Sequence, residues 1–442
     1  MISAVRSAFA LPDLRKKIIF TLLILVVYRL AAHVPVPGVN QAALNSLFST
    51  SSGVGALANV INLLSGGAVS NFSVLAMGVY PYITAQIIIQ LLGGVIPALE
   101  RMMKEEGSAG RKKMETYTYI LTVPMAMLSA IGQVRIFSSA GQEVIPGFFA
   151  EGNFLPSLSV VLTMTAGTFF AIWLGELITE QGIGQGLSII IFGGIVARLP
   201  QNIAQLLADP TKAVFSLLAF VIIIVAIVLV IVVVQEGQRR IPVQYGKRVR
   251  GRKVYGGGST HIPLKVNMAG MIPLIFAQSI LTLPAIIAQI FAGSPDPGVA
   301  SFFTTVVNIF SGGRHSLSFI YWILYFLLVV GFTYFYTDVM VQQQNLPDTL
   351  QKQGGFVPGI RPGARTEEYL NGVTRRITLV GALFLGLISV LPFLISITGL
   401  IDNAVNFSIL STGLLIVVGV VLDTMRQLEA QLTMRHYEGF IK

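Results

Sequence analysis

Residues 219–234 read "AFVIIIVAIVLVIVVV", and the chain continues at residues 241–257 with "IPVQYGKRVRGRKVYGG". The first stretch contains no polar side chain. The second, which we call the basic finger, has no acidic residue and five cationic ones, Lys247, Arg248, Arg250, Arg252 and Lys253. An apolar segment followed by a strand-like basic segment predicts a membrane helix that ends in a charged loop at the membrane surface.

The composition of the whole chain agrees with that prediction. Of 442 residues, 54% are hydrophobic and 11% are charged, whereas a soluble domain has about 25% charged residues. The net charge of +10 must therefore lie in loops. The absence of cysteine excludes disulfides, zinc–thiolate sites and thiol catalysis. We expect no metal and no cofactor, because three histidines, His261, His315 and His436, lie outside the apolar runs and His33 lies at the end of one.

A membrane-spanning helix needs about 20 apolar residues, and ten segments fit that length. They are residues 18–34, 74–96, 117–137, 156–178, 184–204, 214–235, 268–291, 318–338, 376–398 and 406–425. A signal peptide is the alternative for the first segment, which follows Arg15, Lys16 and Lys17. The lack of an A-x-A cleavage site and the nine later segments favour a span. We predict one membrane domain over residues 1–442.

The basic residues predict the orientation. With the N-terminus inside, 25 of the 30 Lys and Arg residues lie in inside segments, counting Arg376 at the edge of its span. Arg29 lies within the first span, and the outside holds only Lys212 and Arg314 in loops and Arg135 and Arg198 toward the outer ends of their spans. The positive-inside rule then predicts that both termini and the basic finger are cytoplasmic.

Two spans are interrupted at corresponding places. The second contains Pro81 after Gly78, and the seventh contains Pro273 and Pro284 after Gly270. Harmless kinks are one interpretation, because prolines are common in membrane helices. The other is functional: ten spans can form two inverted repeats of five, about residues 1–205 and 206–442. Matched interruptions in such repeats indicate a site at their interface.

Residues 55–72, "GALANVINLLSGGAVSNF", precede the second span. The apolar part is too short to cross a bilayer. It is either an amphipathic helix at the outer interface or a half-inserted helix hinged at Gly66 and Gly67, and the pattern leaves both open.

A cavity between the repeats could serve several kinds of cargo. Ion-coupled transporters place charged residues in mid-span, whereas Glu176, Glu180, Asp338 and Asp423 fall at cytoplasmic span ends. The mid-span residues near the interruptions are aliphatic, and an aliphatic constriction gates by dewetting. This favours a large, varied cargo over a small solute. A secondary transporter remains the alternative, and saturable uptake of a small solute would indicate it.

Several long stretches carry a resemblance to the SecY family, the central subunits of bacterial protein-conducting channels. They occur in the family's order along the chain: "PVPGVN", "GVYPYITAQIIIQLL", "ITEQGIGQGLSIIIFGGIVARLP", "GQRRIPVQYGKRV", "STHIPLKVNMAGMIPLIFA", "GGFVPGIRPGARTEEYL" and "TGLLIVVGVVLDTMRQLEAQL". The chain departs from the family at GIGQG, with Gln185 where GIGNG is usual. It departs again at GVYPYI, with Val79 and Tyr80 where GIMPYI is usual. Its tail past His436 is also short, which puts tail contacts with a partner in doubt.

The resemblance implies an all-α membrane protein in which two inverted halves of five helices form an hourglass channel. The positions of the sealing aliphatic ring match Val79, Ile83, Leu187, Ile191, Ile275 and Ile416. A plug helix matches Asn59, Val60, Ile61, Asn62, Leu63, Leu64, Ser65, Gly66 and Gly67. A lateral gate, where signal sequences enter and membrane segments leave to lipid, matches Thr84 and Leu283. Without the resemblance, each ring position is also compatible with plain helix packing.

The resemblance also implies partners for the loops at about 236–267 and 339–375. In the family these loops dock the ATPase SecA or the translating ribosome, and SecE and SecG are companion subunits. The matching residues are Lys247, Arg248, Arg250, Arg252, Lys253, Arg361, Pro362 and Gly363. Clustered Lys and Arg suit rRNA phosphates or an acidic protein surface; a solvated topogenic charge run is the alternative.

The sequence therefore predicts a channel in the bacterial cytoplasmic membrane for unfolded secretory polypeptides and for membrane-protein segments. The chain lacks a GxxxxGK[ST] phosphate loop, so the energy must come from a partner or from the proton-motive force. We expect the channel itself to be no enzyme.

Overall fold

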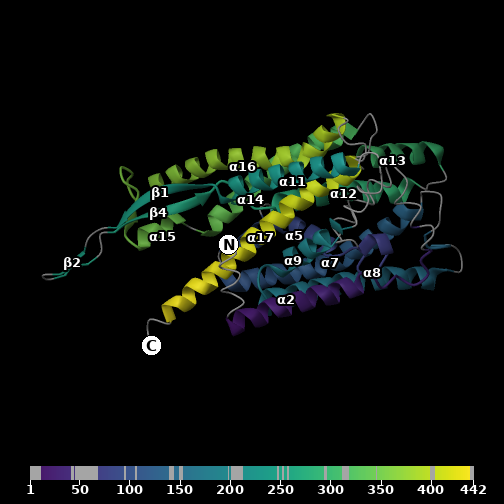
Figure 1. Ribbon diagram of the computed structural model, residues 1–442, viewed down its shortest axis with the longest axis horizontal. Helices are drawn as coiled ribbons and strands as arrows, with labels where there is room; N and C mark the ends of the chain where they lie inside the picture. The colour runs from purple at the N-terminus through teal and green to yellow at the C-terminus, as the bar shows by residue number, and fades with distance from the viewer. Residues whose placement is uncertain are drawn as a thin grey trace.

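The computed structural model describes residues 11–40, 44, 68–93, 96–104, 107–138, 144–148, 153–197, 199–200, 213–245, 248–250, 253–255, 258–292, 296–310, 318–344, 346–398 and 404–438. Figure 1 shows the helices in two groups, those of the first half of the chain below those of the second. The first group contains α2 (Pro12–Ala31), α5 (Tyr80–Gly93), α6 (Pro97–Lys104), α7 (Gly107–Ser138), α8 (Phe154–Gln181) and α9 (Gly186–Val196). The second contains α11 (Ala213–Glu236), α12 (Ile272–Ala292), α13 (Pro297–Phe310), α14 (Ser318–Gln344), α15 (Leu346–Lys352) and α16 (Ala364–Thr398).

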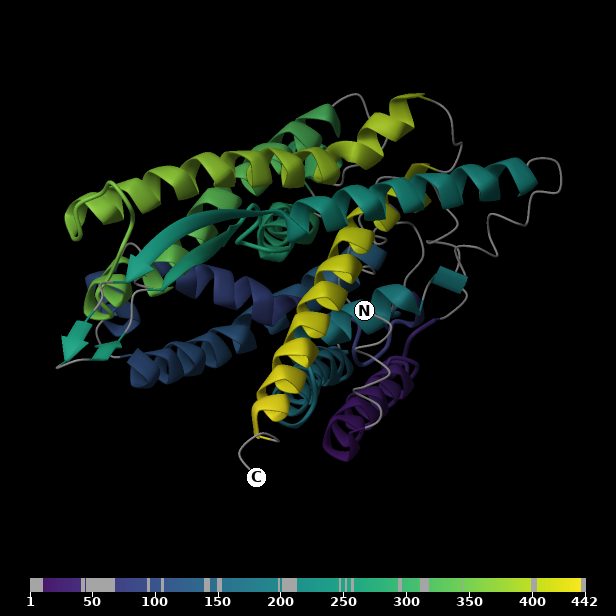
Figure 2. The same ribbon diagram turned by 60° about the vertical axis from the view of Figure 1, so that its left-hand side comes forward.

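The last helix, α17 (Ala404–Glu438), joins the two groups. It contacts α11 and α16 of the second half and also α9 of the first half. Figure 1 shows it running diagonally across the molecule, and the turned view in Figure 2 keeps it between the two groups. The C-terminal span is therefore placed to hold both halves.

Every predicted span coincides at least in part with a described helix. Among the described residues, four helices are each long and apolar enough to cross a membrane, namely Lys112–Arg135, Phe154–Gln181, Phe319–Lys352 and Ala364–Leu391. Several helices are longer than predicted: α16 begins at Ala364 instead of at 376, and α17 ends at Glu438 instead of at 425. Hydropathy detects only the part of a helix that lies in lipid, so the charged extensions escaped prediction.

Two of the predicted interruptions are not kinks. Helix α5 begins at Tyr80 and α12 at Ile272, so Pro81 and Pro273 each occupy the second position of a helix. A first-turn proline costs no hydrogen bond, because its N–H would have no helical partner. The prediction that these prolines interrupt the interior of a span is therefore wrong. Of the three prolines, Pro284 alone lies inside a helix.

The two halves nevertheless begin these helices alike. Gly78 has a φ of +52° and Gly270 a φ of +65°, and each lies two residues before the helix start. Side chains other than glycine are strained in this left-handed region. The matched feature in the two halves is thus a glycine turn followed by a proline-initiated helix.

A small sheet lies at one end of the helices. Strand β1 (Gln238–Tyr245) pairs antiparallel with β4 (Ser259–Lys265), with Ile241 opposite Ile262. The short strand β5 (Gly355–Phe356) pairs with the other edge of β1, which gives the order β4-β1-β5. Beyond the sheet, β2 (Arg248–Arg250) and β3 (Lys253–Tyr255) form a hairpin. The all-α prediction holds for the helices that form the two groups, and the sheet is added outside them.

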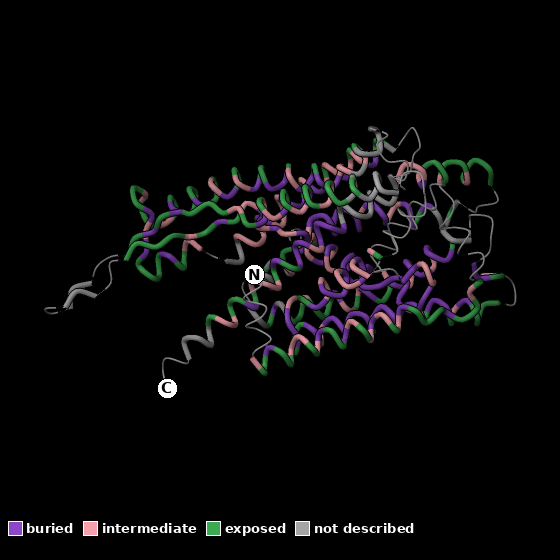
Figure 3. The backbone as a smooth tube through the Cα atoms, viewed as in Figure 1, coloured by how far each residue is buried: buried purple, intermediate pink, exposed green. Residues whose placement is uncertain are grey.

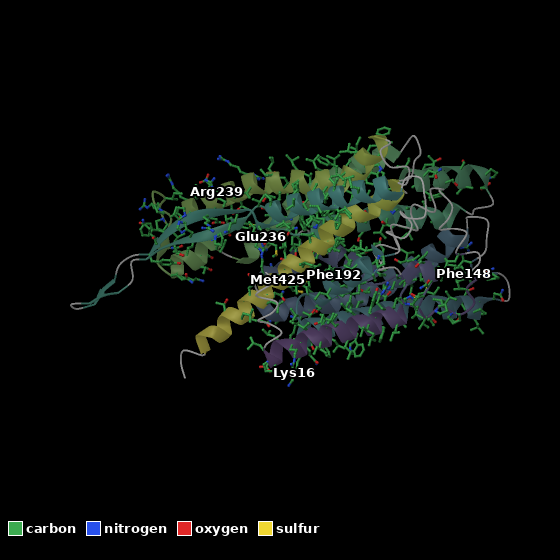
Figure 4. All side chains as sticks on the ribbon, viewed as in Figure 1. Lys16, Phe148, Phe192, Glu236, Arg239 and Met425 are labelled. Carbon is green, nitrogen blue, oxygen red and sulfur yellow. The ribbon has the colours of Figure 1, made fainter. Side chains whose placement is uncertain are left out.

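Burial is greatest where the two groups meet, whereas the sheet and α13 are mostly exposed (Figure 3). The largest cluster of buried apolar side chains draws residues from both halves, among them Tyr28, Ile87, Leu274, Tyr325 and Leu415. A second cluster includes Phe72, Met164 and Ile286 and packs against Phe148, which Figure 4 labels at the end opposite the sheet.

Candidate functional site

The six aliphatic residues of the predicted ring all lie in the described part of the chain. Five of them are buried in the largest hydrophobic cluster, namely Val79, Ile83, Ile191, Ile275 and Ile416. Leu187 is half-buried and packs against the same cluster. The structure therefore brings together residues that are up to 337 positions apart (416 minus 79), from both halves of the molecule.

Glycines position the ring residues of α9. The Cα of Gly186 lies so close to the carbonyl oxygen of Gly175 on α8 that a Cβ would overlap it. A Cβ on Gly175 would in turn lie 2.7 Å from Cδ2 of Leu187. The backbone N–H of Gly186 donates to Oγ1 of Thr179 at 2.9 Å. This close packing fixes the start of α9 and with it Leu187 and Ile191.

The departure at Gln185 falls at the same turn. Gln185 is the residue before α9, and its side-chain carbonyl accepts a hydrogen bond from the Ser188 hydroxyl at 3.1 Å. This bond joins two side chains of the turn, and the Gln185 side chain makes no capping bond to the backbone of α9. Val79, the other ring departure, is buried beside Ile83 in the large cluster.

The two residues of the predicted lateral gate lie on helices from opposite halves. Thr84 is buried on α5, where its hydroxyl donates to the Tyr80 carbonyl at 3.0 Å. Leu283 is half-buried on α12, and α5 and α12 contact each other. Helix α7 also contacts α12, and a Cβ on Gly132 would overlap Cγ2 of Ile286. The seam between the halves is therefore closely packed.

One contact across this seam was not expected from the sequence. The Tyr80 hydroxyl donates a hydrogen bond to the backbone carbonyl of Ser279 at 3.0 Å. Tyr80 belongs to α5 and Ser279 to α12, so the bond joins the two halves. The unusual tyrosine in GVYPYI was the available signal, but its partner could not be read from the sequence.

The Arg361 turn has the shape that the sequence predicts. Gly359 and Gly363 both have positive φ, +82° and +107°, and Arg361 and Pro362 between them are exposed. The Arg361 carbonyl accepts from the Thr366 hydroxyl at 3.0 Å, and the Gly363 carbonyl accepts from the Thr366 N–H at 2.9 Å. The first turn of α16 thus holds the loop that exposes Arg361.

The basic finger is described only in part. Arg248, Arg250 and Lys253 belong to the β2–β3 hairpin, where Arg250 pairs with Lys253 in the backbone register. Lys247, Arg252 and the whole predicted plug, Asn59 to Gly67, lie outside the described residues. Pairing of β5 with β1 makes the finger and the Arg361 loop parts of one structure, although they are separate in sequence. A core of Ile241, Val243, Leu264, Leu350, Val357 and Leu370 supports it.

Charged side chains link the base of this sheet to α17. Nη2 of Arg426 lies 2.7 Å from Oε1 of Glu236 and donates to the Gln235 carbonyl at 3.2 Å, and Nη1 lies 3.7 Å from Oδ1 of Asp423. On β4, desolvation and then the charge of Arg426 lower the pKa of Lys265, against the opposing effects of Asp423 and Glu236. Sequence analysis placed these residues inside but did not predict that they meet.

The labelled residues of Figure 4 show how the two ends of the molecule differ. Lys16, Glu236, Arg239 and Met425 lie toward the end that carries the sheet, and Phe148 lies toward the other. Three residues that the charge pattern predicts to be inside, Lys16, Glu236 and Arg239, thus lie toward one end, and their cytoplasmic placement stays a prediction. Among the described residues, no three His, Cys, Asp or Glu side chains are grouped so that they could hold a metal ion.

Comparison with known proteins identifies a close set of relatives. The SecY family profile matches residues 73–425. The protein translocase subunit SecY of Streptomyces galbus is 43% identical over 452 residues, which covers all of both chains. The protein translocase subunit SecY of Thermotoga maritima is 43% identical over 447 residues, which covers all of this chain and 98% of the relative.

Solved structures share the fold at lower identity. A structure described as that of a protein-conducting channel matches with a TM-score of 0.60 and 17% identity, over 94% of this chain and 92% of that one. A canine Sec61 in a ribosome–channel complex matches with a TM-score of 0.58 and 18% identity, over the same shares of the two chains. At these identities the likeness establishes the arrangement of helices.

Proposed function

The chain belongs to the SecY family, and from this we propose that it is the protein-conducting channel of a translocase in the bacterial cytoplasmic membrane. It passes unfolded polypeptide across the membrane and releases apolar segments sideways into lipid. The observation that carries the proposal is the meeting of aliphatic residues from both halves in one buried cluster. A constriction lined by such side chains excludes water and ions when closed, yet places no chemical demand on the polypeptide that passes.

The ring gives the direct test of this function. An amide in the constriction lowers the cost of wetting it, so Ile83→Asn and Ile275→Asn should let small ions leak through proteoliposomes. The same variants should improve export of proteins with defective signal sequences. Leu229→Asn is the matched control, because Leu229 is 61% exposed on the outer surface of α11. Tight vesicles and unchanged rejection of defective signals for both ring variants would exclude a seal at these residues.

The plug and the gate complete the proposed channel. Residues 59–67 fill the cavity on the outer side of the ring in the resting state, as their match to the family implies. Signal sequences enter between α5 and α12, past Thr84 and Leu283. Contact between these two helices, which come from opposite halves, supports that path.

The sheet end is the proposed docking surface for SecA or the ribosome. The exposed Arg361 and the basic finger belong to one supported structure, so a partner can engage both together. Acidic protein surface or rRNA phosphate would complement their charge. SecE and SecG are the proposed companion subunits, and the many exposed apolar residues of α11 offer them or lipid a membrane-facing surface.

Charge reversal tests the docking surface. Arg361→Glu, and separately Arg252→Glu with Lys253→Glu, should lower SecA- and ATP-dependent translocation into vesicles, because like charges repel at the contact. Lys352→Glu is the control, since Lys352 is exposed on nearby α15 but is not among the proposed contact residues. Protease mapping should give the wild-type topology for all variants. Normal translocation by both reversed variants would leave the finger a solvated charge run.

A further inference from the structure

The bond between Tyr80 and Ser279 occupies a critical place in the seam. Tyr80 is buried, and its hydroxyl reaches across from α5 to a backbone carbonyl of α12 at 3.0 Å. Tyr80 stands directly between Val79, at the ring, and Pro81 in the first turn of the same helix. Parting of α5 from α12 must break this bond, because the two partners belong to different halves.

The acceptor carbonyl belongs to a weakened stretch of helix. Pro284 lies inside α12 and has no N–H, so the carbonyl of Ile280 loses its helical donor. A proline also opens the turn that precedes it. Ser279 is next to Ile280, and its carbonyl is therefore accessible to a side-chain donor from outside the helix. The interaction of Tyr80 with the Thr282 side chain adds a second contact to the same turn.

The rest of the seam contains polar groups without partners. Within the described part of the chain, the hydroxyl of Ser279 is buried and makes no hydrogen bond, and on α7 the same holds for the Ser129 hydroxyl and the Gln133 amide. Ser129, Gly132 and Gln133 share one face of α7 by their spacing, and Gly132 contacts Ile286 of α12. Unsatisfied buried polar groups destabilise the closed seam, because opening allows them to be solvated or bonded.

We propose that Tyr80 is the latch of the lateral gate in this chain and thereby sets how hydrophobic a signal sequence must be to open it. The inference rests on the proposed function. Unpartnered polar groups favour parting of the seam, while the Tyr80–Ser279 bond opposes it. A signal sequence must supply the remaining free energy of opening, and it does so by burying its apolar surface between the helices. Tyr80 is thus a residue that determines specificity, and the family's usual methionine cannot donate this bond.

A second tyrosine provides a matched comparison. The amide of Gln278, the residue before Ser279, donates to the Tyr321 hydroxyl on α14 at 3.1 Å. Tyr321 is as deeply buried as Tyr80, but α12 and α14 belong to the same half. Opening of the seam leaves this bond intact.

The test uses secreted reporters whose signal sequences have graded leucine content, exported by cells that carry only the variant channel. Tyr80→Phe, which removes one oxygen atom, should raise export from the weakest signals by about fivefold, the worth of one net hydrogen bond. Export from strong signals should not change. Tyr80→Met should act like Tyr80→Phe, and Tyr321→Phe should keep the wild-type threshold. An unchanged threshold in Tyr80→Phe, or an equal shift in Tyr321→Phe, would overturn the latch.

A measurement on purified channel removes any dependence on expression level. The chain has no cysteine, so Thr84→Cys, at a position that is buried in the closed seam, provides a single thiol for a labelling reagent. Because this thiol reacts only while the gate is open, adding Tyr80→Phe should speed labelling about fivefold; an unchanged rate contradicts the latch. Wild-type cells that export no reporter at all would instead refute the proposed function, so the two failures are distinguishable.

Discussion

Helix α12 has two sides that are built differently. Toward α14, Phe276 meets Phe332 and Tyr336 edge to face, with ring centroids 6.2 and 6.0 Å apart, and Gln278 is bonded to Tyr321. Toward α5 and α7, the contact has the Tyr80–Ser279 bond, whereas the Ser279 hydroxyl and the Gln133 amide have no partner. Aromatic contacts and the Gln278–Tyr321 bond mark the first side, and a single bond beside the Ser279 and Gln133 groups marks the second.

This difference between the two sides of α12 indicates which of its contacts should persist when the channel opens. Edge-to-face aromatic pairs stabilise beyond their buried area, so we expect the α12–α14 contact to persist when the gate opens. Buried polar groups without partners raise the free energy of the closed seam. We therefore expect the molecule to separate between halves more readily than within one, as the proposed lateral gate requires.

The largest expected effect comes from a covalent bond across the weaker side. Cross-linking Thr84→Cys to Leu283→Cys should reduce translocation to background, because the halves can no longer part. Leu327→Cys with Leu387→Cys is the within-half control; both are exposed, on α14 and α16, whose neighbours Phe326 and Gly386 touch. Vesicle import is measured before and after complete cross-linking. Import by a fully cross-linked gate would show that the seam does not open.

Truncating a side chain between α12 and α14 should lower the stability of the fold and leave opening of the gate unchanged. Phe276 is 3% exposed, and removing such a ring costs about 3–5 kcal/mol of unfolding free energy. Phe276→Ala should therefore lower the thermal midpoint in detergent, followed by the fluorescence of Trp322, which stacks on Phe393 at 5.7 Å. Tyr80→Phe should leave the midpoint close to that of the wild type. Equal losses in both variants would remove the distinction between the two sides.

A pair of glycines tests the same distinction with smaller changes. Gly132→Ala would push Ile286 and thus α12 away from α7 across the seam, whereas Gly386→Ala would press on Phe326, 2.7 Å from the new Cβ, within the second half. Overpacking of this kind costs about 1–3 kcal/mol. Gly132→Ala should increase export from weak signals, and Gly386→Ala should lower the thermal midpoint without changing the threshold. The reverse assignment would contradict a seam between halves.

The sequence was informative where a single element carries the signal. Long apolar runs located a helix for each of the ten predicted spans, because that rule depends on one segment at a time. The sides that the positive charges predict for them stay a prediction. The Arg361 turn was equally predictable, since Gly359 and Gly363 flank it directly. The ring residues came from family resemblance; their own chemistry, aliphatic in an aliphatic chain, distinguishes none of them.

Contacts between distant segments account for what was missed. Pairing of β5 with β1 joins residues that are 112 positions apart (Phe356 with Gln244), and no local pattern specifies the partner of a two-residue strand. The Tyr80–Ser279 bond joins a side chain to a backbone carbonyl, which carries no sequence signal at all. Pro81 and Pro273 were misplaced because hydropathy extends each span through the glycine turn before the helix begins.

The smallest expected effect concerns Lys265, whose charged neighbours Glu236, Asp423 and Arg426 all belong to the second half. After desolvation, Arg426 is the main cause that lowers the Lys265 pKa below its ordinary value of 10.5, so Arg426→Gln should raise it. Glu236→Gln should lower it further, because a charge that favours the ammonium is lost. Between the lowered pKa and 10.5 the unfolded chain binds more protons, so this group makes folding more favourable as pH rises through that alkaline window. Amine labelling of Lys265 against pH, followed by mass spectrometry, measures both shifts.

The titration of Lys265 should be the same in the free channel and in the channel cross-linked at Thr84→Cys and Leu283→Cys, because no contact within a half changes when the gate is locked. A Lys265 pKa that moved on locking would show instead that the cytoplasmic base and the gate are coupled.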